Sequence, residues 1–148
     1  EIVHLVLYKP DRFNRRLVSA VDQLASEQTK LGHTVHLWEI GNAPSDHFQF
    51  RPYHTSLFKV KDFSWSAGTE ISEAIKEHRK GTIVHMQGGF IPLFISLAIQ
   101  IKKINIPFIY TTHGAFNKQV LESAGFLKKI YFHLFENLLI KWSAAVHF

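Results

Sequence analysis

The sequence of 148 residues contains no cysteine. Its absence excludes disulfides, thiol chemistry and zinc sites built on cysteine, and it fits a reducing compartment. No apolar run reaches the roughly 18 residues that a membrane-spanning helix needs. The opening stretch, residues 1–8, has the pattern of a short strand and lacks the basic start and small-residue cleavage site of a secretory signal.

Several motifs of nucleotide binding and catalysis are also missing. The loop after the first apolar run is not G-x-G-x-x-G, and neither G-x-x-x-x-G-K-[ST] nor G-x-S-x-G occurs. These absences argue against a dinucleotide fingerprint, a P-loop and a serine nucleophile. Ten histidines are present without an H-E-x-x-H, and His33 and His36 straddle a turn and a strand. We therefore expect no metal and no cofactor.

Positive charge is concentrated in the second half of the chain. Through Ala74 there are eight Lys and Arg against nine Asp and Glu, and from Ile75 on there are nine against three. Such a basic half suits phosphates, nucleic acid or an anionic membrane surface. A solvated basic surface gives the same composition.

Strand-like and helix-like stretches alternate along the chain. The patterns predict strands at 2–7, 34–40, 56–61 (an edge strand), 82–86, 107–112 and 144–148. They predict helices at 14–31, 69–80, 90–104 and 125–142, with a further helix beginning at 117–122, and Asn14 and Thr69 as N-caps. This order is typical of an α/β fold with a Rossmann-like, doubly wound parallel sheet. We expect residues 1–148 to form one such domain of a longer protein, because the chain stops inside a strand.

The helix expected at 125–142 carries a clear apolar stripe. Its members are Leu127, Ile130, Tyr131, Leu134, Phe135, Leu138 and Leu139, with Glu136 off the stripe. The stripe predicts packing against the sheet. Lys128 and Lys129 beside exposed aromatic rings would suit an anionic bilayer surface instead.

Two of the expected strands end in glycine-containing turns. Gln87-Gly88-Gly89 follows one strand and opens a helix, so its glycines would let backbone N–H groups approach a ligand. His113-Gly114 ends the strand at 107–112, where His113 would face the ligand crevice of an open α/β sheet. Ordinary tight turns, with a solvated histidine at the second, are the alternative.

Three further side chains are candidates in the same region. Lys9 and Arg12 follow the first strand, where a phosphate could rest near a helix start. His85 lies inside the strand before Gln87. Solvated loop charges and a core histidine are the respective alternatives.

A series of short segments resembles a known family. The segments are GHTVHLW at 32–38, IVHMQGG at 83–89, PFIYTTHGAF at 107–116 and KWSAAV at 141–146. Their order and spacing resemble the amino-terminal domain of retaining GT-B glycosyltransferases of family 4. No single segment is specific, but the series is.

The resemblance implies two Rossmann-like domains that face a cleft. The second would hold most of the nucleotide-sugar site, including a Glu-x7-Glu motif. Glu70 and Glu77 are only seven positions apart and lie in an ordinary predicted helix, so that motif is absent. The chain is then the acceptor-binding half, which alone is expected to be inactive.

The same resemblance assigns roles to residues. His113 would face the transferred sugar as the catalytic position, and Lys9 and Arg12, which replace the family's glycine-rich loop, would meet the pyrophosphate of a lipid-linked acceptor. The acceptor-binding positions would be His85, Gln87, Gly88, Gly89, Gly114 and Phe116. The leaving diphosphate would help to deprotonate the acceptor hydroxyl, so no metal or cofactor is expected for this transfer.

The function implied is glycosyl transfer from a nucleotide sugar to a lipid-linked glycan in bacterial surface polysaccharide synthesis, such as O-antigen of lipopolysaccharide. The protein would be peripheral on the inner face of the cytoplasmic membrane, with no nucleic-acid partner. A non-catalytic α/β binding module, or one subunit of a split transferase, remains the alternative. A nicotinamide-dependent enzyme is disfavoured by the missing fingerprint.

Overall fold

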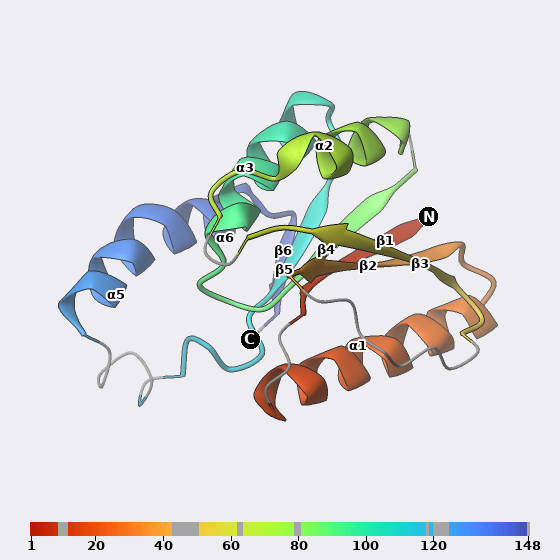
Figure 1. The fold of residues 1–148 in the computed structure, drawn as a ribbon, viewed down its shortest axis with the longest axis horizontal. Helices are drawn as coiled ribbons and strands as arrows, with labels where there is room; N and C mark the ends of the chain where they lie inside the picture. Colours follow the sequence, from red (N-terminus) through yellow and green to blue (C-terminus); the bar gives the residue numbers. More distant parts are fainter. Residues whose placement is uncertain are drawn as a thin grey trace.

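The computed structural model describes residues 1–8, 12–42, 51–61, 64–78, 81–117, 119 and 125–147. Its ribbon is shown in Figure 1. Lys9 and most of the helix expected at 117–122 lie outside the described residues. Arg12 is described as the first residue of a helix, but its side chain is not.

The described residues form one six-stranded parallel sheet. The strands are β1 (Ile2–Leu7), β2 (Val35–Gly41), β3 (His54–Lys59), β4 (Ile83–Gln87), β5 (Phe108–Thr111) and β6 (Ala145–His147). Their order is β3-β2-β1-β4-β5-β6, and every neighbouring pair is parallel. This is the doubly wound order whose direction reverses between β1 and β4. The predicted α/β, Rossmann-like fold is therefore confirmed, and β3 is an edge strand as expected.

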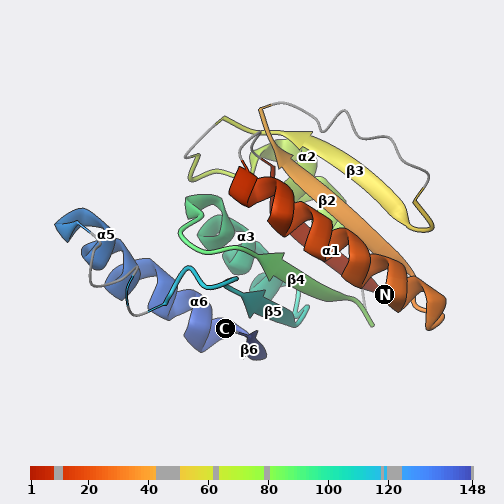
Figure 2. The ribbon, with the colours of Figure 1, turned by 90° about the horizontal axis from the view of Figure 1, so that it is seen from below.

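Helices cover both faces of this sheet. They are α1 (Arg12–Lys30), α2 (Gly68–Glu77), α3 (Pro92–Lys103), α5 (Phe126–Tyr131), the π-helix η1 (Phe132–Glu136) and α6 (Asn137–Trp142). Figures 1 and 2 show α1 on one face and α2 and α3 on the other. In the described part of the chain, no helix is both long enough and apolar enough to cross a bilayer.

Each face of the sheet has its own apolar core. Alternate residues of β1 point to opposite faces, so Val3 and Leu5 join the core under α2, α3 and α6, while Val6 joins the core under α1. Both cores exclude solvent at β1, where Leu5 and Val6 are 0% exposed. The central position of β1, buried on both faces, is the reason its sequence has few polar breaks.

Both predicted N-caps are wrong. Helix α1 begins at Arg12, so Asn14 lies inside its first turn. Helix α2 begins at Gly68, so Thr69 lies inside its first turn. The N–H of Gly68 donates to Ser66 Oγ at 3.4 Å. Ala67 is buried and its N–H donates to Ser96 Oγ of α3. Hydrogen bonds to Ser66 and to Ser96 of α3, and none to Thr69, thus satisfy the backbone N–H groups at the start of α2.

The stripe expected on the last helix is partly wrong as well. Leu127 is 81% and Leu134 is 56% exposed, whereas Glu136, expected to point away from the sheet, is completely buried. The cause is η1, in which the backbone bonds of a π-helix replace those of an α-helix. The π turn breaks the 3.6-residue period, so a stripe drawn with that period places the wrong side chains inside.

Candidate functional site

The two glycine-containing turns lie side by side at the carboxyl edge of the sheet. Strands β4 and β5 are neighbours, and the N–H of Gly88 donates to the carbonyl of Thr111 at 2.8 Å. A Cβ on Gly89 would lie 2.7 Å from the Cβ of Ala115 in the other turn. Glycine is therefore needed at 89 because the two turns touch. Gly88 has a φ of 114°, a conformation that favours glycine. Backbone conformation thus explains Gly88 and packing explains Gly89, and the contact of either glycine with an acceptor stays a prediction.

Two residues at these turns have backbone conformations that side-chain-bearing residues rarely adopt. His113 has a φ of 49° and Phe90 a φ of 59°. Both angles lie in the left-handed region, which is unfavourable for residues other than glycine and asparagine. Residues held in such conformations cluster at binding and catalytic sites. The strain supports a functional role for this edge of the sheet.

A chain of hydrogen bonds holds the imidazole of His113. Its Nε2 lies 2.7 Å from Gln87 Oε1, Gln87 Nε2 lies 3.0 Å from His4 Nδ1, and His4 Nε2 lies 2.7 Å from Gln28 Oε1. An amide oxygen only accepts, so His113 donates from Nε2 and His4 donates from Nε2 to Gln28. A neutral His113 therefore keeps its proton on Nε2 and has an acceptor lone pair on Nδ1.

The histidines of this region are held in the neutral form. Burial lowers the pKa of His113, and the nearby His147 lowers it further. Burial also lowers the pKa of His85 to about 3, with smaller contributions from the neighbouring histidines. His85 is hydrogen-bonded to Thr111 Oγ1 at 2.7 Å. At neutral pH, His113 is thus an uncharged donor and acceptor at the strand end.

Sequence reasoning missed Glu136, which ties the first turn to the rest of the fold. Its Oε1 accepts the N–H of Phe90 at 2.8 Å, and its Oε2 accepts the hydroxyl of Tyr110 on β5. Burial raises its pKa to about 6, although both hydrogen bonds oppose the rise. The carboxyl group fixes the strained backbone of Phe90. No local signal could have found it, because the π turn alone brings it inward.

Aromatic rings extend the site towards α5. Phe116 lies edge-on to Phe90 with ring centroids 5.5 Å apart, and Phe116 and Phe132 are 4.9 Å apart. The ammonium of Lys128 lies 4.3 Å from the ring centroid of Phe90, in cation–π geometry. Lys128, expected at a membrane, therefore also packs on the turn, and both Lys128 and Lys129 are exposed.

Unused hydrogen-bonding groups lie beside these turns. Among the described residues, Thr112 Oγ1 and Tyr131 Oη are the buried side-chain polar atoms without a partner. Thr112 precedes His113, and the ring of Tyr131 packs 6.0 Å from that of Phe90. Buried polar atoms without a partner are rare. Thr112 thus brings an unused hydrogen-bonding group next to His113, and Tyr131 brings one to the aromatic rings around Phe90.

The described residues line hollows along the carboxyl edge, of which two matter here. The larger, of about 530 Å³, is lined by residues 57–59 at the end of β3 and by residues 67–71 at the start of α2. The smaller, of about 30 Å³, lies at the β1–β4 switch point and is lined by Leu7, Val60, Lys61, Ser64 and residues 90–93. His113 lines neither of them, although Phe90 belongs to the second. His113 and the hollows therefore share an edge but not a pocket.

The structure brings most of the predicted site together. His113, Gly114 and Phe116 belong to one turn, and Gln87, Gly88 and Gly89 belong to the other, with His85 deeper along β4. Lys9 and the side chain of Arg12 lie outside the described residues, so their phosphate contact stays a prediction. Lys128 and Lys129 lie on α5 next to this group.

The chain matches the model of a known protein family. Residues 17–148 match the family model described as Glycosyltransferase Family 4. No curated protein and no solved structure matches the chain.

Proposed function

Because the chain belongs to Glycosyltransferase Family 4, we propose that it is the acceptor-binding half of a retaining glycosyltransferase of the GT-B fold. The observation that carries the proposal is the neutral His113 at the carboxyl edge, held by Gln87 and set in a strained backbone. A second Rossmann-like domain would supply most of the nucleotide-sugar site. This half alone would then be inactive.

The proposed reaction moves a hexosyl or N-acetylhexosaminyl group. The bond between the anomeric carbon and the donor diphosphate breaks, and a bond from that carbon to the acceptor oxygen forms on the same face. The leaving diphosphate takes the proton of the acceptor hydroxyl. Catalysis rests on stabilising the charge that develops on the diphosphate, and His113 positions the transferred sugar through Nδ1 or its backbone. The transfer needs no cofactor and no metal.

The acceptor proposed is a glycan on a lipid pyrophosphate. Residues Gly89, Gly114 and Phe116 border the place for its sugar, with His85, Gln87 and Gly88 behind them. Lys9 and Arg12 would meet its pyrophosphate. The basic second half of the chain supports an anionic acceptor of this kind. The biological setting proposed is bacterial surface polysaccharide synthesis, such as O-antigen.

The surface of α5 supports docking on a membrane. Phe126 is 77% and Leu127 is 81% exposed, and Lys129 lies exposed between the apolar positions of the helix. Apolar side chains with adjacent lysines suit an anionic bilayer. We place the protein peripherally on the inner face of the cytoplasmic membrane, where a lipid-linked acceptor would be within reach of the two turns.

This docking predicts the behaviour of one surface leucine. Leu127→Ser is expected to weaken binding to phosphatidylglycerol vesicles by at least about tenfold, because an inserted leucine side chain contributes about 1.5–3 kcal/mol. Co-sedimentation at low and high salt measures the binding, which should fall as salt rises. Leu31→Ser is the matched control, since Leu31 is 78% exposed at the end of α1. Equal effects of the two substitutions, or retention independent of salt, would contradict the docking.

The test of the proposed function uses the complete protein. It is incubated with a panel of nucleotide sugars and a lipid-pyrophosphate sugar, and the product is analysed by mass spectrometry and NMR. We expect one donor to give a glycosylated lipid with the anomeric configuration retained. An inverted product would refute the retaining mechanism. Binding of the acceptor without product from any donor would favour a non-catalytic module or a subunit of a split transferase.

A further inference from the structure

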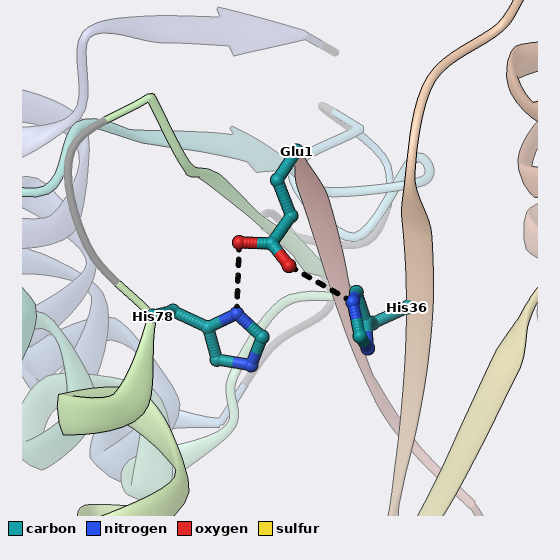
Figure 3. A group of neighbouring side chains, drawn as sticks. All are labelled: Glu1, His36 and His78. Carbon is teal, nitrogen blue, oxygen red and sulfur yellow. Dashed lines mark ion pairs between the residues drawn. The ribbon is translucent and has the colours of Figure 1, made fainter.

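A second group of polar side chains lies at the opposite edge of the sheet from His113. Glu1 precedes β1, His36 is the second residue of β2, and His78 follows α2. Figure 3 shows the carboxylate of Glu1 between the two imidazoles. Glu1 Oε1 lies 2.9 Å from His36 Nε2, and Glu1 Oε2 lies 3.0 Å from His78 Nδ1. Three chain segments thus bring nitrogen and oxygen donors within 4.8 Å of one another.

The neighbouring residues hold these three side chains in place. The buried Thr82 donates from its hydroxyl to Glu1 Oε2 at 2.6 Å. The ring of His36 stacks on that of His54 at 5.0 Å, and the ring of His78 lies edge-on to His36 at 5.0 Å. Outer contacts of this kind orient the ligands of metal sites. The cluster is also reachable from solvent, since the side chain of Glu1 is 29% exposed.

We propose that Glu1, His36 and His78 bind one zinc ion. Two imidazole nitrogens and one carboxylate oxygen form a donor set that zinc uses in proteins, with water in the fourth position. Bonds of about 2.0–2.2 Å place tetrahedral donors roughly 3.3 Å apart. The three donor atoms already lie within 4.8 Å of one another, so small shifts bring them to that spacing. On binding, each neutral imidazole exchanges its proton through solvent, so that the nitrogen facing the ion becomes free to bind and the other ring nitrogen carries the proton.

The ion would cross-link three segments that are distant in sequence. It would join the start of β1, the start of β2 and the end of α2, at the edge away from the proposed transfer. Zinc that binds only the folded chain stabilises it by mass action. This role is independent of catalysis, so failure of the glycosyl-transfer proposal would leave it standing. The site escaped the sequence search because its members are 35 and 42 positions apart.

The experiment titrates zinc into the metal-stripped full chain by calorimetry in a non-chelating buffer. We expect one zinc per chain and a rise in melting temperature. His78→Ala should weaken binding at least tenfold and abolish the rise, because it removes a ligand. His33→Ala removes an exposed histidine of the same edge and should behave as wild type. Circular dichroism checks that each metal-free variant is folded.

A measurement on the wild-type chain avoids dependence on the variants. Zinc should slow the modification of His36 and His78 by diethylpyrocarbonate, read by peptide mass spectrometry, and leave His33 unchanged. If zinc changed the modification rate of none of these three histidines, the proposal would be overturned. The proposal would also be overturned if zinc did not bind the wild-type chain, or if it bound His78→Ala equally well. Glu1, His36 and His78 would then be a group of ion-paired side chains without a metal.

Discussion

Replacement of His113 by alanine in the complete enzyme is expected to lower kcat about 100-fold, while the melting temperature falls by only a few degrees. Removing one well-placed hydrogen-bonding group from a transferase site costs on the order of 10²–10³ in rate. The stability loss is small because the side chain gives up one hydrogen bond, to Gln87, worth about 1 kcal/mol. Product formation and differential scanning calorimetry measure the two effects.

Two further variants separate catalysis from folding at this position. His113→Asn keeps a residue that tolerates the left-handed backbone and can donate to Gln87, so it should retain the melting temperature and part of the rate. His33→Ala, at the opposite edge, should change neither quantity. If kcat and stability fell in parallel in His113→Ala, the histidine would be a structural residue of the strand end.

Loss of Glu136 is expected to produce the largest change in stability. Glu136→Ala leaves the N–H of Phe90 and the hydroxyl of Tyr110 buried without their acceptor, and each unpaired group costs about 1–3 kcal/mol. We expect the free energy of unfolding to fall by roughly 3 kcal/mol or more. Glu136→Gln keeps an acceptor for Phe90 and should lose much less. Urea unfolding of the three proteins at pH 7 measures the difference.

Glu136 should also make stability depend on pH in a defined direction. Its pKa is about 6 in the folded chain against 4.5 for an ordinary glutamate, so between these values the folded state binds more protons than the unfolded state. The carboxyl group therefore contributes stability that is present below pH 4.5 and lost as pH rises through 6. The free energy of unfolding contributed by this group is roughly 2 kcal/mol larger well below pH 4.5 than well above pH 6.

The comparison with Glu136→Gln isolates this effect from other carboxylates. We expect the free energy of unfolding of wild type, minus that of the glutamine variant, to fall by that amount between pH 4.5 and pH 7. A difference that stays constant over this range would show that Glu136 titrates normally. The same experiment tests whether the π turn holds the side chain inside in solution.

The features that could be predicted from sequence depend on short-range pattern. Apolar runs ending at Gly88 and Gly114 located the carboxyl ends of β4 and β5, because a buried parallel strand is apolar throughout and its turn needs glycine. Parallel strands end at the same edge of a sheet, so Gln87 and His113 could be predicted to lie on one edge. The start of α2 at Gly68 could not be predicted, since the preceding Ala67 bonds to Ser96, which lies 29 positions away in the sequence.

The features that could not be predicted depend on tertiary contacts. The period used for the last helix assumed regular α-helical bonds, and η1 interrupts them, so Glu136 was placed on the wrong face. The bonds from Gln87 to His4 and from His4 to Gln28 join three elements that no spacing rule connects. The cluster of Glu1, His36 and His78 is likewise assembled only by the sheet.

The central place of β1 has a consequence for synthesis on the ribosome. Ile2 pairs with Val35 on one side and with Ile83 on the other. β1 can pair with β2 once the chain has been made as far as Gly41. The other edge of β1 can pair only after β4 has been made. At about 5–20 residues per second, that interval lasts several seconds. During it an apolar strand edge is unpaired and open to other nascent chains, which makes this stage the point at which chaperones matter most for the protein's yield.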